Sequence, residues 1–122
     1  MSAVTLLSPL AGLPGTEYEL EPVDAGLFTL RSQGGTQRLF VVAGEVLPSY
    51  QPEVADEQAA ALGLAGPDDA ELYVVVNPAD GEPTLNLMAP IVVNRRTRAA
   101  AQLVLDGTRW PLRAALGEVL AG

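Results

Sequence analysis

The sequence lacks three residue types that carry much of enzyme chemistry. Its 122 residues contain no Cys and no His, and every basic residue is Arg, so Lys is absent too. Without Cys there are no disulfides, thiolate nucleophiles or zinc–thiolate sites. Without His, the usual general base and the commonest metal ligand are missing. Without Lys, Schiff bases and the P-loop lysine are excluded. We therefore predict a protein that is not an enzyme and has no catalytic residues, metal or cofactor.

Long apolar runs are also absent. The longest, such as residues 39–43, are about five residues, far short of the ~20 needed to span a bilayer. The start, Met1-Ser2-Ala3, has no basic region, and residues 4–7 are too short for the apolar part of a secretory signal. We expect a cytoplasmic protein without membrane contact. Since 48% of the residues are hydrophobic, we expect one domain over residues 1–122 with a real core.

Positive charge is scarce. Fifteen acidic residues face seven basic ones, which gives a net charge of −8. Such a surface repels phosphate backbones, so we expect no direct nucleic-acid binding. It favours a basic protein partner, because opposite potentials steer association. The alternative is that the acidity only keeps the protein soluble.

Short apolar segments separated by turn residues run along the whole chain. Alternation and β-branched content predict strands, while glycine-containing pairs between them predict hairpin turns. The predicted strands are residues 18–22, 27–32, 37–43, 70–77, 84–88, 91–94 and 98–105. The predicted turns are Gly34-Gly35, Asp80-Gly81 and Asp106-Gly107.

Two segments favour short helices. Residues 56–63 have acids in the first turn, alanines in the middle and Gly63 where a helix-ending glycine would lie. Residues 112–120 are weakly helical. We also expect Phe40, Tyr73 and Trp110 in the core, given their apolar neighbours. The fold class is thus mainly β: a small antiparallel β-barrel-like domain of six or seven short strands with one or two short helices, with a sandwich as the alternative.

The densest acidic cluster is Asp68, Asp69 and Glu71. A metal site needs several converging oxygen ligands, and the sequence supplies no further ligands at a recognisable spacing. We interpret the cluster as a solvated turn before a strand, with a partner-facing acidic patch as the alternative.

Three arginines, Arg95, Arg96 and Arg98, crowd a predicted turn. Arginine forks onto phosphate or carboxylate, so they could anchor an anionic group. The alternative is a charged loop tip that protects a strand end.

Residues 84–94 (TLNLMAPIVVN) combine features of an exposed edge. Asn86 is polar within an apolar run, Met88 is adaptable, and Ala89-Pro90 interrupts strand pairing. This combination suits a surface where a partner strand or helix docks. The alternative is a bulge that bends the sheet to close a barrel.

The same run carries a family resemblance. Residues 73–116 closely resemble the flagellar assembly factor FliW family, whose pattern includes Asn-Leu-x-Ala-Pro-Ile-Val-x-Asn and a final aromatic-Pro-aliphatic-Arg. The matching positions are Thr84, Asn86, Leu87, Ala89, Pro90, Ile91, Val92, Asn94, Thr97, Gln102, Trp110, Pro111, Leu112 and Arg113.

The resemblance implies a non-enzymatic regulator on a small β-barrel-like domain. Members of this family bind the translational repressor CsrA and, alternatively, flagellin. Flagellin that accumulates in the cell takes FliW from CsrA, and its secretion frees FliW to lift repression. We therefore expect CsrA and flagellin as partners, no cofactor, and a monomer in isolation.

We predict that partners contact the edge of the 84–94 run, with the acidic cluster supplying charge. The predicted contact residues are Asn86, Leu87, Met88, Ala89, Pro90, Ile91, Asn94, Asp68, Asp69 and Glu71. One alternative is an acidic interaction module on the same fold with a different basic partner. Another is an enzyme or metal-dependent binder that uses the three acids.

Overall fold

The computed structural model describes residues 2–10, 15–34, 37–47, 50–78, 81–105 and 110–115. Within these ranges the chain forms strands joined by short turns, one α-helix and two 3-10 turns. The elements are β1 (Ser2–Leu6), β2 (Glu17–Asp24), β3 (Leu27–Ser32), β4 (Arg38–Ala43), η1 (Gly44–Val46), α1 (Asp56–Ala61), η2 (Pro67–Asp69), β5 (Ala70–Asn77), β6 (Thr84–Leu85), β7 (Ile91–Asn94), β8 (Ala99–Gln102) and β9 (Ala114–Ala115).

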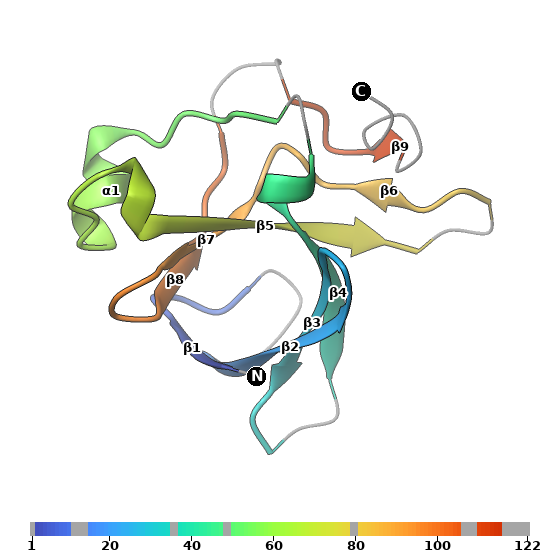
Figure 1. Ribbon diagram of the computed structural model, residues 1–122, viewed down its shortest axis with the longest axis horizontal. Coiled ribbons are helices and arrows are strands. Elements are labelled where there is room, and N and C mark those ends of the chain that lie inside the picture. Colours follow the sequence, from blue (N-terminus) through green and yellow to red (C-terminus); the bar gives the residue numbers. More distant parts are fainter. Residues whose placement is uncertain are drawn as a thin grey trace.

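Seven strands close into a barrel. Their order is β4-β3-β2-β1-β8-β7-β5, and β5 pairs back onto β4. In Figure 1 these strands surround the core, with α1 to one side and β6 and β9 to the other. The predicted mainly β, barrel-like fold is therefore confirmed. Closure leaves no free edge along the paired length of these strands, which protects them from pairing with other chains.

One pairing differs from the expected antiparallel pattern. β1 and β8 run parallel, with Thr5 opposite Ala99 and Leu6 opposite Ala100. The amide of Leu7 continues this ladder by donating to the carbonyl oxygen of Ala100 at 2.8 Å. The other strand pairs are antiparallel. The first strand of the fold therefore closes the barrel against one of the last.

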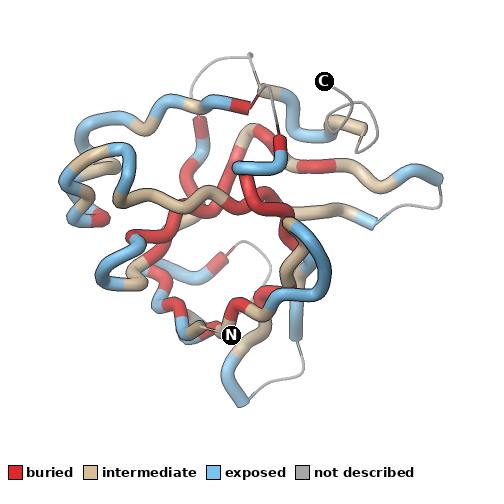
Figure 2. The backbone as a smooth tube through the Cα atoms, in the orientation of Figure 1, coloured by how far each residue is buried: buried red, intermediate tan, exposed pale blue. Residues whose placement is uncertain are grey.

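Alternating side chains of the central strands fill separate cores. On β5, Tyr73 lies in the barrel core, and its neighbour Val74 belongs to a second cluster with Leu85, Leu87 and Tyr50. Figure 2 shows the buried backbone concentrated on the inner strands. This arrangement explains why residues 72–76 are apolar without interruption: both faces of β5 are covered there.

A third cluster lies beneath the helix. Leu62, Val92 and Leu103 pack together, with Val54 and Leu64 around them. The helix itself ends as predicted, because Gly63 adopts φ +68° and its amide donates to the carbonyl oxygen of Ala60.

Three expectations fail in the described residues. Phe40 is 42% exposed and lies near Arg38, with the guanidinium 5.9 Å from the ring centroid, because alternation on β4 turns it away from the core. Residues 114–115 form strand β9 rather than helix, since they pair with β6 on the side away from β5. The sequence pattern also gave no sign of β1. By contrast, Tyr73 is buried, and Trp110 is half-buried with its ring 4.8 Å from that of Tyr50.

Parts of the predicted turns fall outside the described residues, namely Gly35, Asp80, Asp106 and Gly107, as do residues 116–120 of the second predicted helix. The hairpin between β3 and β4 is confirmed by their antiparallel register. In the parts of the chain that the structure describes, no helix is long and apolar enough to cross a membrane.

Candidate partner-binding site

Most of the predicted contact residues in the 84–94 run lie in the interior. Leu87, Ala89, Pro90, Ile91 and Asn94 are all buried. Leu87 packs in the second core and Ile91 in the barrel core. In this structure these five side chains stabilise the fold and face other parts of the same chain.

Asn86 and Met88 are half-buried and reach the surface. The amide of Asn86 donates to the carbonyl oxygen of Val75 at 3.0 Å, and its side-chain oxygen accepts the amide of Ala89 at 3.1 Å. Asn86 therefore braces the bend between β6 and β7. The carbonyl of Met88 accepts the amide of Leu105 at 2.8 Å, which ties this bend to the segment after β8.

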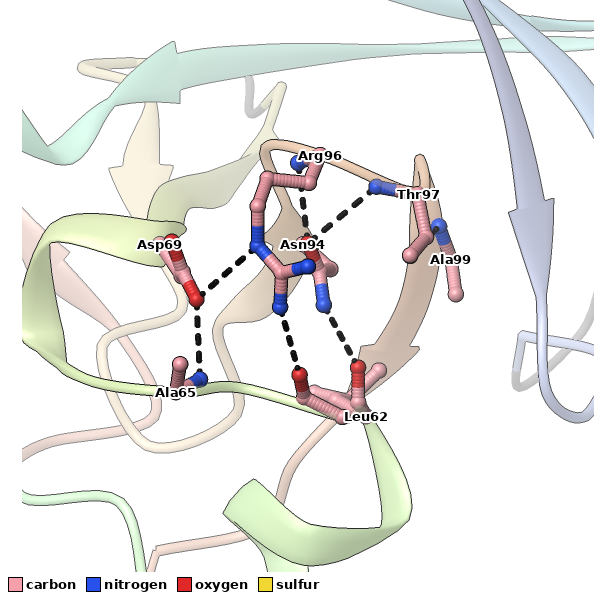
Figure 3. A network of polar contacts seen from close by, with 8 residues as sticks. Leu62, Ala65, Asp69, Asn94, Arg96, Thr97 and Ala99 are labelled. Atoms are coloured by element: carbon pink, nitrogen blue, oxygen red, sulfur yellow. Dashed lines mark hydrogen bonds and ion pairs between the residues drawn. The ribbon is translucent and has the colours of Figure 1, made fainter.

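Asn94 is fully buried and satisfies three main-chain groups (Figure 3). Its Nδ2 donates to the carbonyl oxygen of Leu62 at 2.8 Å. Its Oδ1 accepts the amides of Arg96 at 2.9 Å and Thr97 at 3.2 Å. A buried amide with all these partners joins the end of α1 to the turn between β7 and β8. Asn94 thus has a structural role, because it holds these two segments together.

The acidic and arginine clusters face each other. β5 and β7 pair with Ala70 opposite Asn94, and this register brings the acids before β5 beside the arginines after β7. Arg96 Nε lies 3.2 Å from Asp69 Oδ2, as Figure 3 shows, and Arg98 Nη1 lies 3.1 Å from Glu71 Oε1. Arg95 Nε lies 3.6 Å from Glu71 Oε2.

These ion pairs change the interpretation of both clusters. The carboxylate of Asp69 also accepts the amide of Ala65 at 2.8 Å, and this bond, followed by Arg96, lowers its pKa below the ordinary value. The arginines thus neutralise two of the three acids from within. Among the described residues, no group of three or more Asp, Glu, Cys or His is placed to hold a metal ion.

Arg98 adopts the left-handed backbone conformation, with φ 65°. Besides Glu71, its guanidinium donates to the hydroxyl of Ser2 at 2.9 Å, while its Nε is buried without a partner. The strained backbone lets this side chain reach both β5 and β1, next to the parallel closure of the barrel.

The predicted contact residues therefore form two separate groups. Asp68, Asp69 and Glu71 lie at the start of β5, while Asn86 bonds to Val75 near its end. Glu71 lies four positions and Asp69 six positions before Val75, which corresponds to roughly 13–20 Å along an extended chain. Asp68 is exposed and is the acid of the cluster whose carboxylate makes no ion pair to a described residue.

A groove of about 650 Å³ lies beside α1 and was not predicted from the sequence. One wall is the segment 51–58, which contributes three exposed acids, Glu53, Asp56 and Glu57. Val104, Leu105 and Trp110 line the rest. The three acids near the start of the predicted helix were a sequence signal for an acidic surface at this wall. No local pattern linked these acids to Val104, Leu105 and Trp110, because tertiary packing brings them together.

Comparison with known proteins gives a consistent result. The family model described as "FliW protein" matches residues 1–116. A flagellar assembly factor FliW from Geobacillus kaustophilus is 32% identical over 108 residues, which cover 81% of this chain and 75% of that protein. The one from Anoxybacillus flavithermus is 32% identical over 119 residues, covering 90% and 82%.

A shorter match is more similar. The flagellar assembly factor FliW of Syntrophus aciditrophicus is 40% identical over 78 residues, which span 61% of this chain and 49% of that protein. Among solved structures, a crystal structure of the flagellar assembly factor FliW superposes with a TM-score of 0.84 at 25% identity, over 93% of this chain and 84% of the other. With nearly the whole sequence matched and the barrel shared, this chain belongs to the FliW family.

Proposed function

We propose that this chain is a cytoplasmic flagellar assembly factor that binds and antagonises a CsrA-type translational repressor. It alternatively binds flagellin, and so couples flagellin synthesis to flagellin secretion. The observation that carries this proposal is membership of the FliW family over residues 1–116. The net charge of −8 supports it, because an acidic antagonist suits an RNA-binding partner with a basic surface. In this role the protein acts by binding and performs no chemistry.

The described surface supports part of the predicted contact set. Asn86 and Met88 at one end of β5 and Asp68 at the other are accessible to a partner. Asp69 and Glu71 are held by arginines of the same chain, so they contribute less free charge. We propose that Asn86, Met88 and Asp68 contact partners, while the buried residues of the run hold the bend in shape.

The test is a calorimetric titration of this protein with the CsrA of the same cell, repeated with flagellin added. The proposal expects saturable binding that flagellin displaces and that weakens as salt rises. If the folded protein binds neither partner at low salt, the proposal is wrong. A pull-down that instead recovers another basic protein would favour the alternative of an interaction module with a different partner.

Asp68→Asn separates local charge from net charge. We expect it to weaken repressor binding a few-fold at low salt and to flatten the salt dependence, since an exposed pair contributes about 0.2–1 kcal/mol. The matched control is Asp24→Asn, an equal charge change at an exposed position in the β2–β3 turn, whose amide-capping oxygen is kept. Equal affinities for the two variants would remove Asp68 from the contact surface.

A further inference from the structure

We propose that the groove beside α1 binds an extended, basic segment of a partner protein, which adds as a strand to the main chain of Val104. This inference rests on the proposed function only in assuming that the protein works by binding a protein partner. It names the surface and the chemistry of the bound segment.

Val104 lies on a backbone segment that pairs with described residues on one side only. The amides of Leu103 and Leu105 donate to the carbonyl oxygens of Pro90 at 2.9 Å and Met88 at 2.8 Å. Because alternate residues of an extended strand present their main-chain groups to opposite sides, the amide and carbonyl of Val104 face away from residues 88–90. They make no hydrogen bond to any described residue.

The unpaired side of this segment begins where the pairing of β1 with β8 ends. β1 covers β8 as far as Ala100, whose carbonyl accepts the amide of Leu7. Two residues later, Pro9 follows on the β1 side, and a proline has no amide with which to continue that ladder. An incoming strand that pairs with Val104 exchanges two hydrogen bonds with this one residue.

The side chains around this edge favour an apolar anchor. Val104 is 62% exposed, which is high for a valine next to a core residue such as Leu105. Leu105, Val54 and the half-buried Trp110 lie with it in the groove. An aliphatic side chain of the bound segment would cover Val104.

The opposite wall favours basic side chains. Glu53, Asp56 and Glu57 are exposed, and among the described residues the groove lining contains no Arg and none of these carboxylates makes an ion pair. They differ in this from Asp69 and Glu71, which arginines of the chain neutralise. Side chains two positions apart on a strand share a face, so arginine or lysine two residues from the aliphatic side chain that covers Val104 would face this wall.

The test uses two synthetic peptides with blocked ends, Arg-Thr-Arg-Thr-Val-Thr-Arg and Glu-Thr-Glu-Thr-Val-Thr-Glu, titrated into ¹⁵N-labelled protein. In each peptide the valine and the three charged residues share one face of an extended strand. We expect the basic peptide to shift amide resonances of residues 51–58 and 103–105 and to slow hydrogen exchange at Val104. The acidic peptide should leave them unmoved. Shifts confined to other surfaces, or equal shifts with both peptides, would overturn the proposal.

Substitutions test separately the acidic wall of the groove and the strand edge at Val104. Glu53→Gln, Asp56→Asn and Glu57→Gln together should weaken the basic peptide about tenfold at low salt, as three exposed pairs each contribute a factor of about two. The control combines Glu17→Gln, Asp24→Asn and Glu45→Gln, the same charge change at exposed acids outside the groove. Equal weakening by both triples would show net charge alone and contradict the groove.

Val104→Pro removes the edge amide without changing charge and breaks no described hydrogen bond. It should weaken the peptide more than Val104→Ala, which shortens the side chain but keeps the amide. If both bind equally, strand addition is wrong. Repressor and flagellin titrations separate the proposals: a protein that binds either but takes no peptide in the groove keeps the proposed function and loses this inference. A protein that binds the peptide in the groove but binds neither the repressor nor flagellin keeps this inference and loses the proposed function.

Discussion

At the scale of single residues, the polar groups of this protein stabilise its turns. Asn94 has no exposed surface, and each hydrogen bond that its side chain makes is to a main-chain group outside the helix and the strands. Leaving a buried carbonyl or amide without a partner costs about 1–3 kcal/mol, so such a side chain contributes more than its size indicates.

We expect Asn94→Ala to lower the free energy of unfolding by about 2–4 kcal/mol, because it leaves the Leu62 carbonyl and two amides without their partner. Urea unfolding followed by circular dichroism measures this. Asn86→Ala is the control, since it removes one bond at a half-buried position and should cost about 1 kcal/mol. Similar losses for both variants would contradict the role assigned to Asn94.

Asp69 should make stability depend on acidity. Its pKa is lowered in the folded protein, chiefly by the Ala65 amide and also by Arg96, from 3.8. A carboxylate of this kind stabilises the fold above its unfolded pKa, and this contribution is lost as the pH falls through 3.8 toward the lower folded value. Asp69→Asn should therefore be less stable than the parent above pH 3.8 and approach it below.

Unfolding of the parent and of Asp69→Asn at pH values on both sides of 3.8 tests this. Asp68→Asn provides the control, as Asp68 lies next in sequence and its carboxylate makes no ion pair in the described chain. A difference between parent and Asp69→Asn that stays constant with pH would refute the assignment.

The sequence indicated which polar residues matter, but it did not indicate which residues of the same chain they contact. The acids at 68–71 and the arginines at 95–98 were both singled out, but as separate features. What pairs them is the register of β5 with β7, which puts Ala70 opposite Asn94. Likewise, the pattern of residues 84–94 indicated a special segment, yet Leu87 is buried in the second core and Ile91 in the barrel core.

At the scale of elements, the β2–β3 hairpin depends on one glycine. Gly26 has φ +75°, and a Cβ there would lie 2.7 Å from Val46 Cγ1, so the turn fits tightly against η1. Gly34, in the β3–β4 hairpin, has φ +69° but open space around it. The two positions share the backbone conformation and differ in their surroundings.

Gly34→Ala should cost about 1 kcal/mol from the backbone alone, and Gly26→Ala about 2–3 kcal/mol because the contact with Val46 adds to it. Thermal and urea unfolding compare them. Adding Val46→Ala to Gly26→Ala should return the loss toward that of Gly34→Ala. Additive effects of the two substitutions would show that the contact with Val46 does not matter.

Elements with strong local signals were predicted closely. Residues 27–32 and 70–77 coincide with β3 and β5, and the helix ends at the expected glycine. β1 and β9 were missed for a physical reason: each is short, and its strand character comes from neighbours. β1 lies between β2 and β8, and the two alanines of β9 pair with β6.

At the scale of the whole molecule, barrel closure should appear in hydrogen exchange. The amides of Thr5 and Leu7 donate across the parallel seam to Arg98 and Ala100 at 3.0 and 2.8 Å. Opening this seam breaks the barrel, so both amides should exchange with the free energy of global unfolding. The amide of Val104 in the free protein should exchange orders of magnitude faster. NMR-detected exchange measures all three, and fast exchange at Thr5 would mean that the seam opens independently.

The barrel as a class was within reach of the sequence, because regular turn spacing and one-sided alternation favour a closed antiparallel sheet. Its topology was not. The parallel pairing of β1 with β8 depends on which strands are left facing each other once the hairpins have formed, and no local pattern records this.

That seam also has a consequence for how the protein is made. A ribosome releases residue 6 long before its partner, residue 100. Until β8 emerges, β1 can pair only with β2, and its other side stays open. The native structure therefore waits for nearly the whole described chain to be synthesised, and its many distant contacts make the last step a slow one. A nascent chain stalled before β8 would expose a strand edge that the finished protein never shows.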